Sequence, residues 1–179
     1  MSRIEPISSR QVYANNWMTV REDSIRRPDG SQGIYGVVDK PDYALVLARR
    51  DDGYFALVEQ YRYPLAMRRW EFPQGAVGLH DLDPGELAHR ELREETGIVA
   101  EQLTYLGLLD VAAGMSSQRG RVFLATGITE GDPEREHEEQ DLRHGWFARA
   151  RIEEMMRAGE ITDAQSIAAW MLLALHERP

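Results

Sequence analysis

The chain has 179 residues, a formal net charge of −9 at pH 7 and no cysteine. The acidic excess argues against a nucleic-acid backbone or an anionic membrane as partner. The lack of cysteine excludes disulfides and thiolate metal sites. The sequence contains neither an apolar run long enough to span a membrane nor a signal peptide. We therefore expect a cytoplasmic protein, most simply folded as one domain over residues 1–179.

The first third of the chain predicts short strands separated by turn signals, with apolar and polar residues alternating over Trp17–Arg21. The turn Pro-Asp-Gly at residues 28–30 ends the first stretch, and Asp51–Gly53 predicts a hairpin turn further along. The expected strands are Val12–Arg26 (as one or two strands), Ile34–Val38, Tyr43–Ala48 and Tyr54–Tyr61.

A capped helix is predicted at Pro84–Thr96. Asp83 is suited to the N-cap, proline to the first helical position, and Glu86 to the third position of a capping box. Gly97 is suited to the left-handed residue that ends a helix. The buried side of this helix is expected to contain Leu87, Ala88 and Leu92.

The C-terminal half predicts three strands and two helices. The strands are Leu103–Val111, Gly120–Gly127 and Gly145–Arg149, and the helices are Ile152–Ala158 and Asp163–His176. The last helix places an apolar stripe on one face, which we expect in the core or at a subunit contact. The stripe consists of Ile167, Trp170, Met171 and Ala174. Many strands with three helices indicate an α+β fold.

Three carboxylates crowd the end of the predicted helix at 84–96. Glu91 and Glu95 lie on one face, about 40° apart around the axis and about 6 Å apart along it, with Glu94 beside them. Like charges at this spacing cost a few tenths of a kcal/mol each, which a bound divalent cation such as Mg²⁺ would offset. The alternative is a solvated acidic face in which Arg90 and Glu94 form an ordinary ion pair.

The segment Gly75–Ile98 resembles the Nudix box, whose pattern is G-x5-E-x7-R-E-U-x-E-E-x-G-U with U a bulky aliphatic residue. Residues 90–98 match it at every specified position. The first half departs from it, because the loop is one residue longer and Leu82 stands where the pattern has Glu. Asp81 and Asp83 are the candidates to stand in for that Glu. The departure concerns the loop geometry more than metal binding.

The likeness extends to about residues 11–177. Glu59–Pro64 and Trp70–Pro73 are similar to the ADP-ribose and nucleoside-diphosphate-sugar pyrophosphatase branch of that family, and so is Gly159–Ala164. This resemblance implies an α/β/α sandwich with a mixed sheet. It also implies that residues 1–40 form an N-terminal strand segment that pairs across a homodimer.

The resemblance also implies roles for individual residues. The metal ligands would be Glu91, Glu94, Glu95 and the backbone carbonyl of Gln74. The ion would be Mg²⁺, which Mn²⁺ can replace because both favour oxygen ligands. A carboxylate from the acidic loop at 131–143 would orient or deprotonate the water, and the sequence leaves open whether Glu138 or Glu139 supplies it.

Three further residues are candidates for binding the substrate. Arg62 is a phosphate or ribose contact, since a pyrophosphate needs cations. Glu71 lies in the similar segment just before the box. Trp17 is a candidate for stacking on the nucleoside base, from the partner subunit in the related branch. For Arg62 and Trp17 the alternative is an ordinary solvated position.

The first functional hypothesis is Mg²⁺-dependent hydrolysis of a nucleoside diphosphate sugar, of the ADP-ribose or GDP/ADP-sugar type, to a nucleoside monophosphate and a sugar phosphate. The second is hydrolysis of dinucleoside polyphosphates or RNA 5′-pyrophosphates, because Phe72–Gly75 is also similar to that branch. The third is a Nudix-like binding module without catalysis, suggested by the irregular first half of the box.

Overall fold

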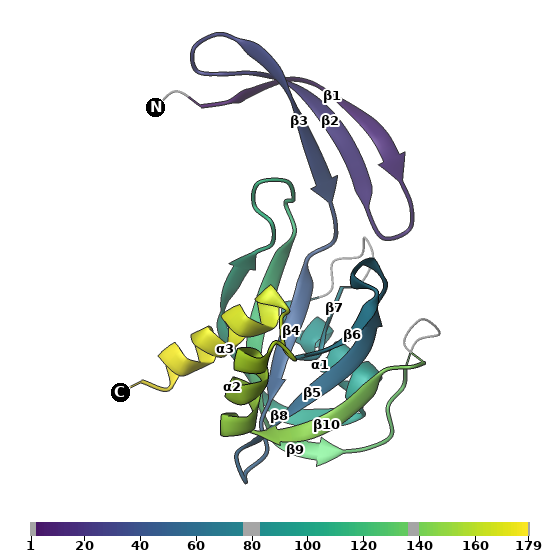
Figure 1. The fold of residues 1–179 in the computed structure, drawn as a ribbon, viewed down its shortest axis with the longest axis vertical. Helices are drawn as coiled ribbons and strands as arrows, with labels where there is room; N and C mark the ends of the chain where they lie inside the picture. The colour runs from purple at the N-terminus through teal and green to yellow at the C-terminus, as the bar shows by residue number, and fades with distance from the viewer. Residues whose placement is uncertain (1–2, 77–82, 136–139, 179) are drawn as a thin grey trace.

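A computed structural model describes residues 3–76, 83–135 and 140–178 (Figure 1). The strands are β1 (Glu5–Ala14), β2 (Thr19–Arg26), β3 (Gln32–Asp39), β4 (Tyr43–Ala48), β5 (Tyr54–Arg62), β6 (Met67–Glu71), β7 (Gln74–Gly75), β8 (Ile98–Asp110), β9 (Arg119–Glu130) and β10 (Arg143–Ala148). The helices are α1 (Pro84–Thr96), α2 (Arg149–Ala158) and α3 (Ala164–His176), with one 3₁₀ turn, η1 (Tyr63–Leu65). None of the helices in the described ranges is long and apolar enough to span a membrane.

The strands form three sheets, with the orders β1-β2-β3, β10-β5-β6 and β7-β4-β9-β8. The pairing of β4 with β9 is parallel and the other strand pairings are antiparallel. Figure 1 shows the first sheet standing apart at the top, while the other two lie between α1 behind and α2 and α3 in front. The predicted α+β fold, a mixed-sheet sandwich with an N-terminal strand segment, is confirmed.

Strand β4 lies at the centre of the sandwich and is buried on both faces. Alternate side chains of a strand point to opposite faces. Tyr43, Leu45 and Leu47 accordingly join the core cluster beneath α2 and α3. Ala44, Val46 and Ala48 join the cluster beneath α1. A strand buried on both faces reads as a continuous apolar run, as this one does.

Helix α1 has the bounds that its capping residues predict. The Asp83 carboxylate accepts hydrogen bonds from the N–H groups of Gly85, at 2.8 Å, and Glu86, at 3.4 Å. Gly97 ends the helix at φ 75°, and a Cβ there would overlap the backbone of Gly131. The predicted buried side is confirmed, since Leu87, Ala88 and Leu92 are all in the core.

The segment predicted as one or two strands is two, and the first begins earlier than expected, at Glu5. Every residue of β1 is exposed. Since neither face of this strand is buried, its apolar and polar residues have no need to alternate, and the sequence contains no clear strand signal there. The chain turns after β1 because the Asn15 side-chain oxygen accepts hydrogen bonds from the N–H groups of Trp17 and Met18, both at 2.9 Å. Such an Asx turn competes locally with continued strand pairing.

The structure adds to two details of the prediction. Asp51–Gly53 forms the predicted hairpin turn, with Gly53 at φ 85° and an antiparallel bridge between Arg49 and Phe55, but β4 and β5 beyond it enter different sheets. On α3, Met171 is 55% exposed and Ile167 is also exposed, so of the predicted stripe only Trp170 is buried. The face that α3 buries is offset around the axis and contains Ser166, Ala169, Trp170 and Leu173.

Candidate functional site

Two of the predicted metal ligands lie buried between α1 and β7. Glu91 is 7% exposed and Glu95 is 1% exposed. The N–H of Gln74 donates a hydrogen bond to Glu95 Oε2 at 3.2 Å. A Cβ at Gly75 would overlap the Glu91 carboxylate, so the glycine makes room for it. The structure thus brings Glu91, Glu95 and the backbone of Gln74 together.

The third carboxylate of the helix has a different partner. Glu94 Oε1 accepts from Arg90 Nε at 2.8 Å, the ion pair that the spacing allows. Among the described residues, no three acidic or histidine side chains form a ready-made metal site. The donors still fit a hard divalent cation in kind, because buried carboxylate oxygens lie beside backbone and no thiolate can compete in a chain without cysteine. Recruiting Glu94 requires it to leave or share Arg90.

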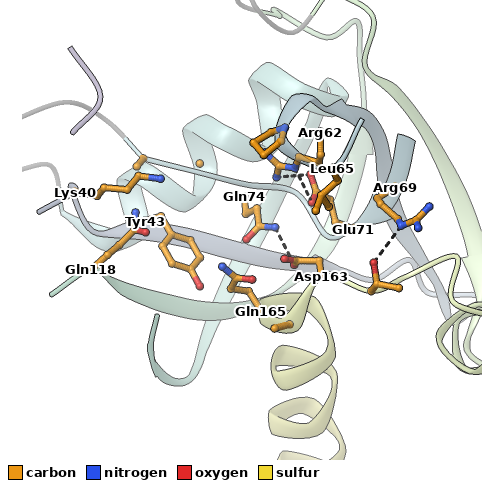
Figure 2. A pocket seen from close by; sticks show the side chains of 15 residues that line it. Lys40, Tyr43, Arg62, Leu65, Arg69, Glu71, Gln74, Gln118, Asp163 and Gln165 are labelled. Atoms are coloured by element: carbon orange, nitrogen blue, oxygen red, sulfur yellow. Dashed lines mark hydrogen bonds and ion pairs between the residues drawn. The ribbon is translucent and has the colours of Figure 1, made fainter. Parts of the chain in front are cut away.

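A pocket of about 500 Å³ adjoins β7 (Figure 2). One end carries Arg62, Arg69 and Glu71, the middle carries Gln74, Asp163 and Gln165, and the other end carries Lys40, Tyr43 and Gln118. The walls come from β4 to β7, from the residue before β9 and from the start of α3. Gln74 and Gly75 border both this pocket and the buried glutamates, although neither glutamate lines the pocket itself.

Arg62 and Glu71 face each other from the adjacent strands β5 and β6. Arg62 donates to both Glu71 oxygens, from Nη2 at 2.6 Å and from Nε at 3.2 Å, and Gln60 also donates to Glu71. Burial raises the pKa of the Glu71 carboxyl, although the charge and hydrogen bonds of Arg62 oppose this shift. Glu71 is buried while the Arg62 side chain is partly exposed. The carboxylate therefore holds the guanidinium at the pocket wall.

The start of α3 is fastened to the strands that carry the site. Asp163 caps the helix by accepting from the Ser166 N–H at 2.8 Å, and it also accepts from Gln74 Nε2 at 3.1 Å. Ser166 Oγ accepts in turn from the Phe72 N–H at 3.0 Å. The sequence did not assign Asp163 to the site. The sequence predicted Asp163 only as the first residue of the last helix, and its partner Gln74 lies on a strand 89 residues earlier.

The two catalytic candidates, Glu138 and Glu139, lie outside the described residues. The chain before them is tied to α1, since Arg135 Nε donates to the Glu95 carbonyl at 3.4 Å and Glu134 lies 3.5 Å from Arg93. The chain after them is tied to β6, because Arg68 donates to the Asp141 carboxylate at 2.6 Å and to its carbonyl at 2.8 Å.

Trp17, the candidate for base stacking, is not brought to the site by its own chain. It is 59% exposed in the turn between β1 and β2. It is absent from the pocket lining that the described residues provide. Only a second chain, or a rearrangement of the N-terminal sheet, would bring Trp17 to a bound base.

Comparison with known proteins places these observations in a family. A model described as the NUDIX domain matches residues 39–170, and one described as the nucleoside diphosphate sugar hydrolase N-terminal domain matches residues 4–38. An ADP-ribose pyrophosphatase of Mycobacterium tuberculosis is 37% identical over 173 residues, which cover 96% of this chain and 83% of the relative. An ADP-ribose pyrophosphatase of Bacillus subtilis is 27% identical over 174 residues, covering 96% and 92%.

A solved structure described as an ADP compounds hydrolase superposes with a TM-score of 0.82, covering 96% of this chain and 92% of that one. At 20% sequence identity, this likeness shows the fold alone. The match of the NUDIX model to most of the chain carries the assignment, and the relative that is 37% identical agrees with it. The chain belongs to the Nudix family.

Proposed function

We propose that this Nudix pyrophosphohydrolase cleaves nucleoside diphosphate sugars, with ADP-ribose the first substrate to test, into a nucleoside monophosphate and a sugar phosphate. The observation that carries the proposal is the pair of buried carboxylates, Glu91 and Glu95, packed against β7 beside a polar pocket. The two relatives named ADP-ribose pyrophosphatase support this substrate class.

The chain's own residues would bind and orient the pyrophosphate. Arg62 lies at the pocket wall, where its guanidinium can bind phosphate oxygens. Glu71 would fix the direction of that guanidinium through the two hydrogen bonds between them. Since the charged oxygens of a pyrophosphate repel a nucleophile, the cationic contact would also favour attack.

Mg²⁺ is the cofactor that we propose, with Mn²⁺ able to replace it. Glu91, Glu95 and the backbone carbonyl of Gln74 would hold it, with Glu94 once its pairing with Arg90 is broken or shared. When bound, the ion would neutralise phosphate charge and lower the pKa of water. Glu138 or Glu139 would accept the proton of the attacking water, a role supported by the ties of the flanking residues to α1 and β6.

We also propose a homodimer built on the N-terminal sheet. Apolar side chains on this small sheet and directly beside it are exposed in the single chain, including Ile4, Ile7, Val12, Tyr13, Trp17 and Ile34. A second copy would cover this surface and would supply Trp17 to the base of a substrate bound to the first copy.

The proposed function is tested by a substrate panel. Wild-type protein would be incubated with ADP-ribose, GDP-mannose and diadenosine tetraphosphate, with Mg²⁺ or with EDTA, and the products identified by mass spectrometry. We expect Mg²⁺-dependent release of a nucleoside monophosphate and a sugar phosphate. A strong preference for diadenosine tetraphosphate would instead favour the polyphosphate branch. No turnover of any substrate would favour a binding module.

A further inference from the structure

The end of the pocket away from Arg62 contains a buried hydroxyl with no role in the proposed mechanism. Tyr43 is 6% exposed and lines the pocket from β4 (Figure 2). Its hydroxyl is covered and has no hydrogen-bond partner among the described residues. Buried polar groups in proteins are almost always paired, so an unpaired one at a pocket wall points to a partner that binds there.

The Tyr43 ring is held in this position by the fold. Tyr43 pairs with Gly120 across the parallel strands β4 and β9. A Cβ at position 120 would overlap the hydroxyl end of the ring, so only glycine leaves space for it. The ring also belongs to the core cluster beneath α2 and α3. A packed ring of this kind presents its hydroxyl in one direction and loses little entropy when a ligand binds.

Lys40 also lines this end, so its positive charge and the negative charge of Asp163 oppose each other. The neutral groups of Tyr43 and Gln118 therefore decide which ligand atoms bind there. Burial, and then the Asp163 carboxylate, raises the pKa of the Tyr43 hydroxyl, which therefore remains protonated and able to donate. The same carboxylate would repel a phosphate, whereas the Lys40 ammonium can donate to an oxygen of either a phosphate or a sugar. Gln118 adds an amide whose orientation is fixed by donation from Nε2 to the Pro41 carbonyl at 2.7 Å, which leaves its Oε1 to accept.

These groups match the hydroxyls of a sugar, each of which both donates and accepts hydrogen bonds. A nucleobase stacks best on an aromatic face, and in the proposed dimer that face comes from Trp17 of the second copy. Tyr43 is the one aromatic residue in the pocket lining that the structure describes, and its ring is in the core. The sugar is therefore the part of the substrate that this end suits best.

We propose that Tyr43 and Gln118 form the subsite for the sugar of the nucleoside diphosphate sugar, and that Tyr43 is a specificity-determining residue that donates a hydrogen bond to a sugar hydroxyl. This inference rests on the proposed function. Because the Tyr43 oxygen is covered in the structure, contact requires a neighbouring pocket side chain to shift.

The test uses Tyr43→Phe, which removes the hydroxyl and keeps the ring. Calorimetry in EDTA would measure how tightly wild type and variant bind two ligands. One is ADP-ribose, and the other is ADP methyl ester, which keeps the adenosine ribose but lacks the terminal one. We expect Tyr43→Phe to raise the dissociation constant of ADP-ribose about tenfold and that of ADP methyl ester less than twofold. The melting temperature of the free variant should stay level or rise, because an unpaired buried hydroxyl is removed. Tyr105→Phe, on the exposed face of β8, is the matched control.

Equal loss for both ligands, or no loss for either, would overturn the sugar subsite. The proposed function can fail separately. If wild type binds ADP-ribose and Tyr43→Phe weakens it selectively, while no nucleotide sugar is hydrolysed with Mg²⁺, the subsite stands and the catalytic proposal fails. If ADP-ribose is hydrolysed and Tyr43→Phe binds it normally, the subsite fails alone. If ADP-ribose neither binds nor is hydrolysed, both fail.

Discussion

Glu71 shows how one buried carboxyl links the site to stability. Its pKa is raised above the ordinary value of 4.5, mainly by burial, so the folded state binds this proton more tightly than the unfolded state does. The stability contributed by that proton is therefore fully present below the ordinary pKa and is lost as pH rises through the raised one. Ionised Glu71 is nevertheless the form that accepts both hydrogen bonds from Arg62.

Replacing Glu71 with Gln should remove this pH dependence. The unfolding free energy of wild type should fall with rising pH above about 4.5 relative to that of the variant, by at most about 1.4 kcal/mol per pH unit. The Arg62 ion pair forms only with ionised Glu71, so its contribution is part of this pH dependence and is lost with it in the variant. Urea unfolding of both proteins across pH 4 to 8 measures the difference. Parallel curves would show that Glu71 does not titrate in the folded protein as described.

At the scale of residues, the sequence predicted the site as far as local spacing allowed. Glu91 and Glu95 were predicted as neighbours because helical geometry puts them on one face. The same spacing put Glu94 near Arg90, the ion pair that the structure contains. Tyr43 was predicted as the start of a short strand, but the pocket beside it forms only when β4, β7, the chain before β9 and the start of α3 come together.

The element most sensitive to a small change is the two-residue strand β7. A methyl group at Gly75 would overlap the Glu91 carboxylate, the far end of a flexible side chain. Gly75→Ala should therefore displace Glu91 and reduce Mg²⁺-dependent turnover at least tenfold, while the unfolding free energy changes by less than about 2 kcal/mol. Enzyme assays and urea unfolding would measure both quantities.

The matched control for that substitution is Gly36→Ala. Gly36 also lies in a strand, but a methyl group there would have no atom within 4 Å. It should keep wild-type turnover. If Gly75→Ala is as active as this control, the placement of Glu91 against β7 is not needed for activity.

Elements were predicted well where their signals are local. Helix α1 has the expected bounds because Asp83 and Gly97 cap it through neighbouring backbone groups. The predicted start of strand β1, Val12, is too late, because a fully exposed strand needs no alternation of apolar and polar residues. The turn at Asp51–Gly53 was read correctly, but a tight turn alone cannot tell whether its strands pair. Here the β4 backbone pairs with β7 and β9 instead of β5.

At the scale of the whole molecule, the N-terminal sheet is the part whose side chains are largely exposed to solvent. We expect a homodimer at micromolar concentration, because apolar side chains on this sheet and directly beside it, such as Val12 and Trp17, would otherwise face water. Sedimentation velocity measures this directly. A monomeric mass would contradict both the dimer and the contribution of Trp17 to the other subunit.

That residues 1–179 form one domain also stays a prediction, which a single cooperative unfolding transition would support.

The central claim is that the buried carboxylates of α1 support metal-dependent hydrolysis of a pyrophosphate bond. The most direct measurement compares Mg²⁺-dependent turnover of ADP-ribose by wild type and Glu95→Gln, which keeps the size of the side chain and removes its charge. We expect turnover to fall at least a hundredfold. The melting temperature without metal should stay level or rise, because repulsion from Glu91 is relieved. A Glu95→Gln protein that still hydrolyses ADP-ribose at the wild-type rate would contradict the account.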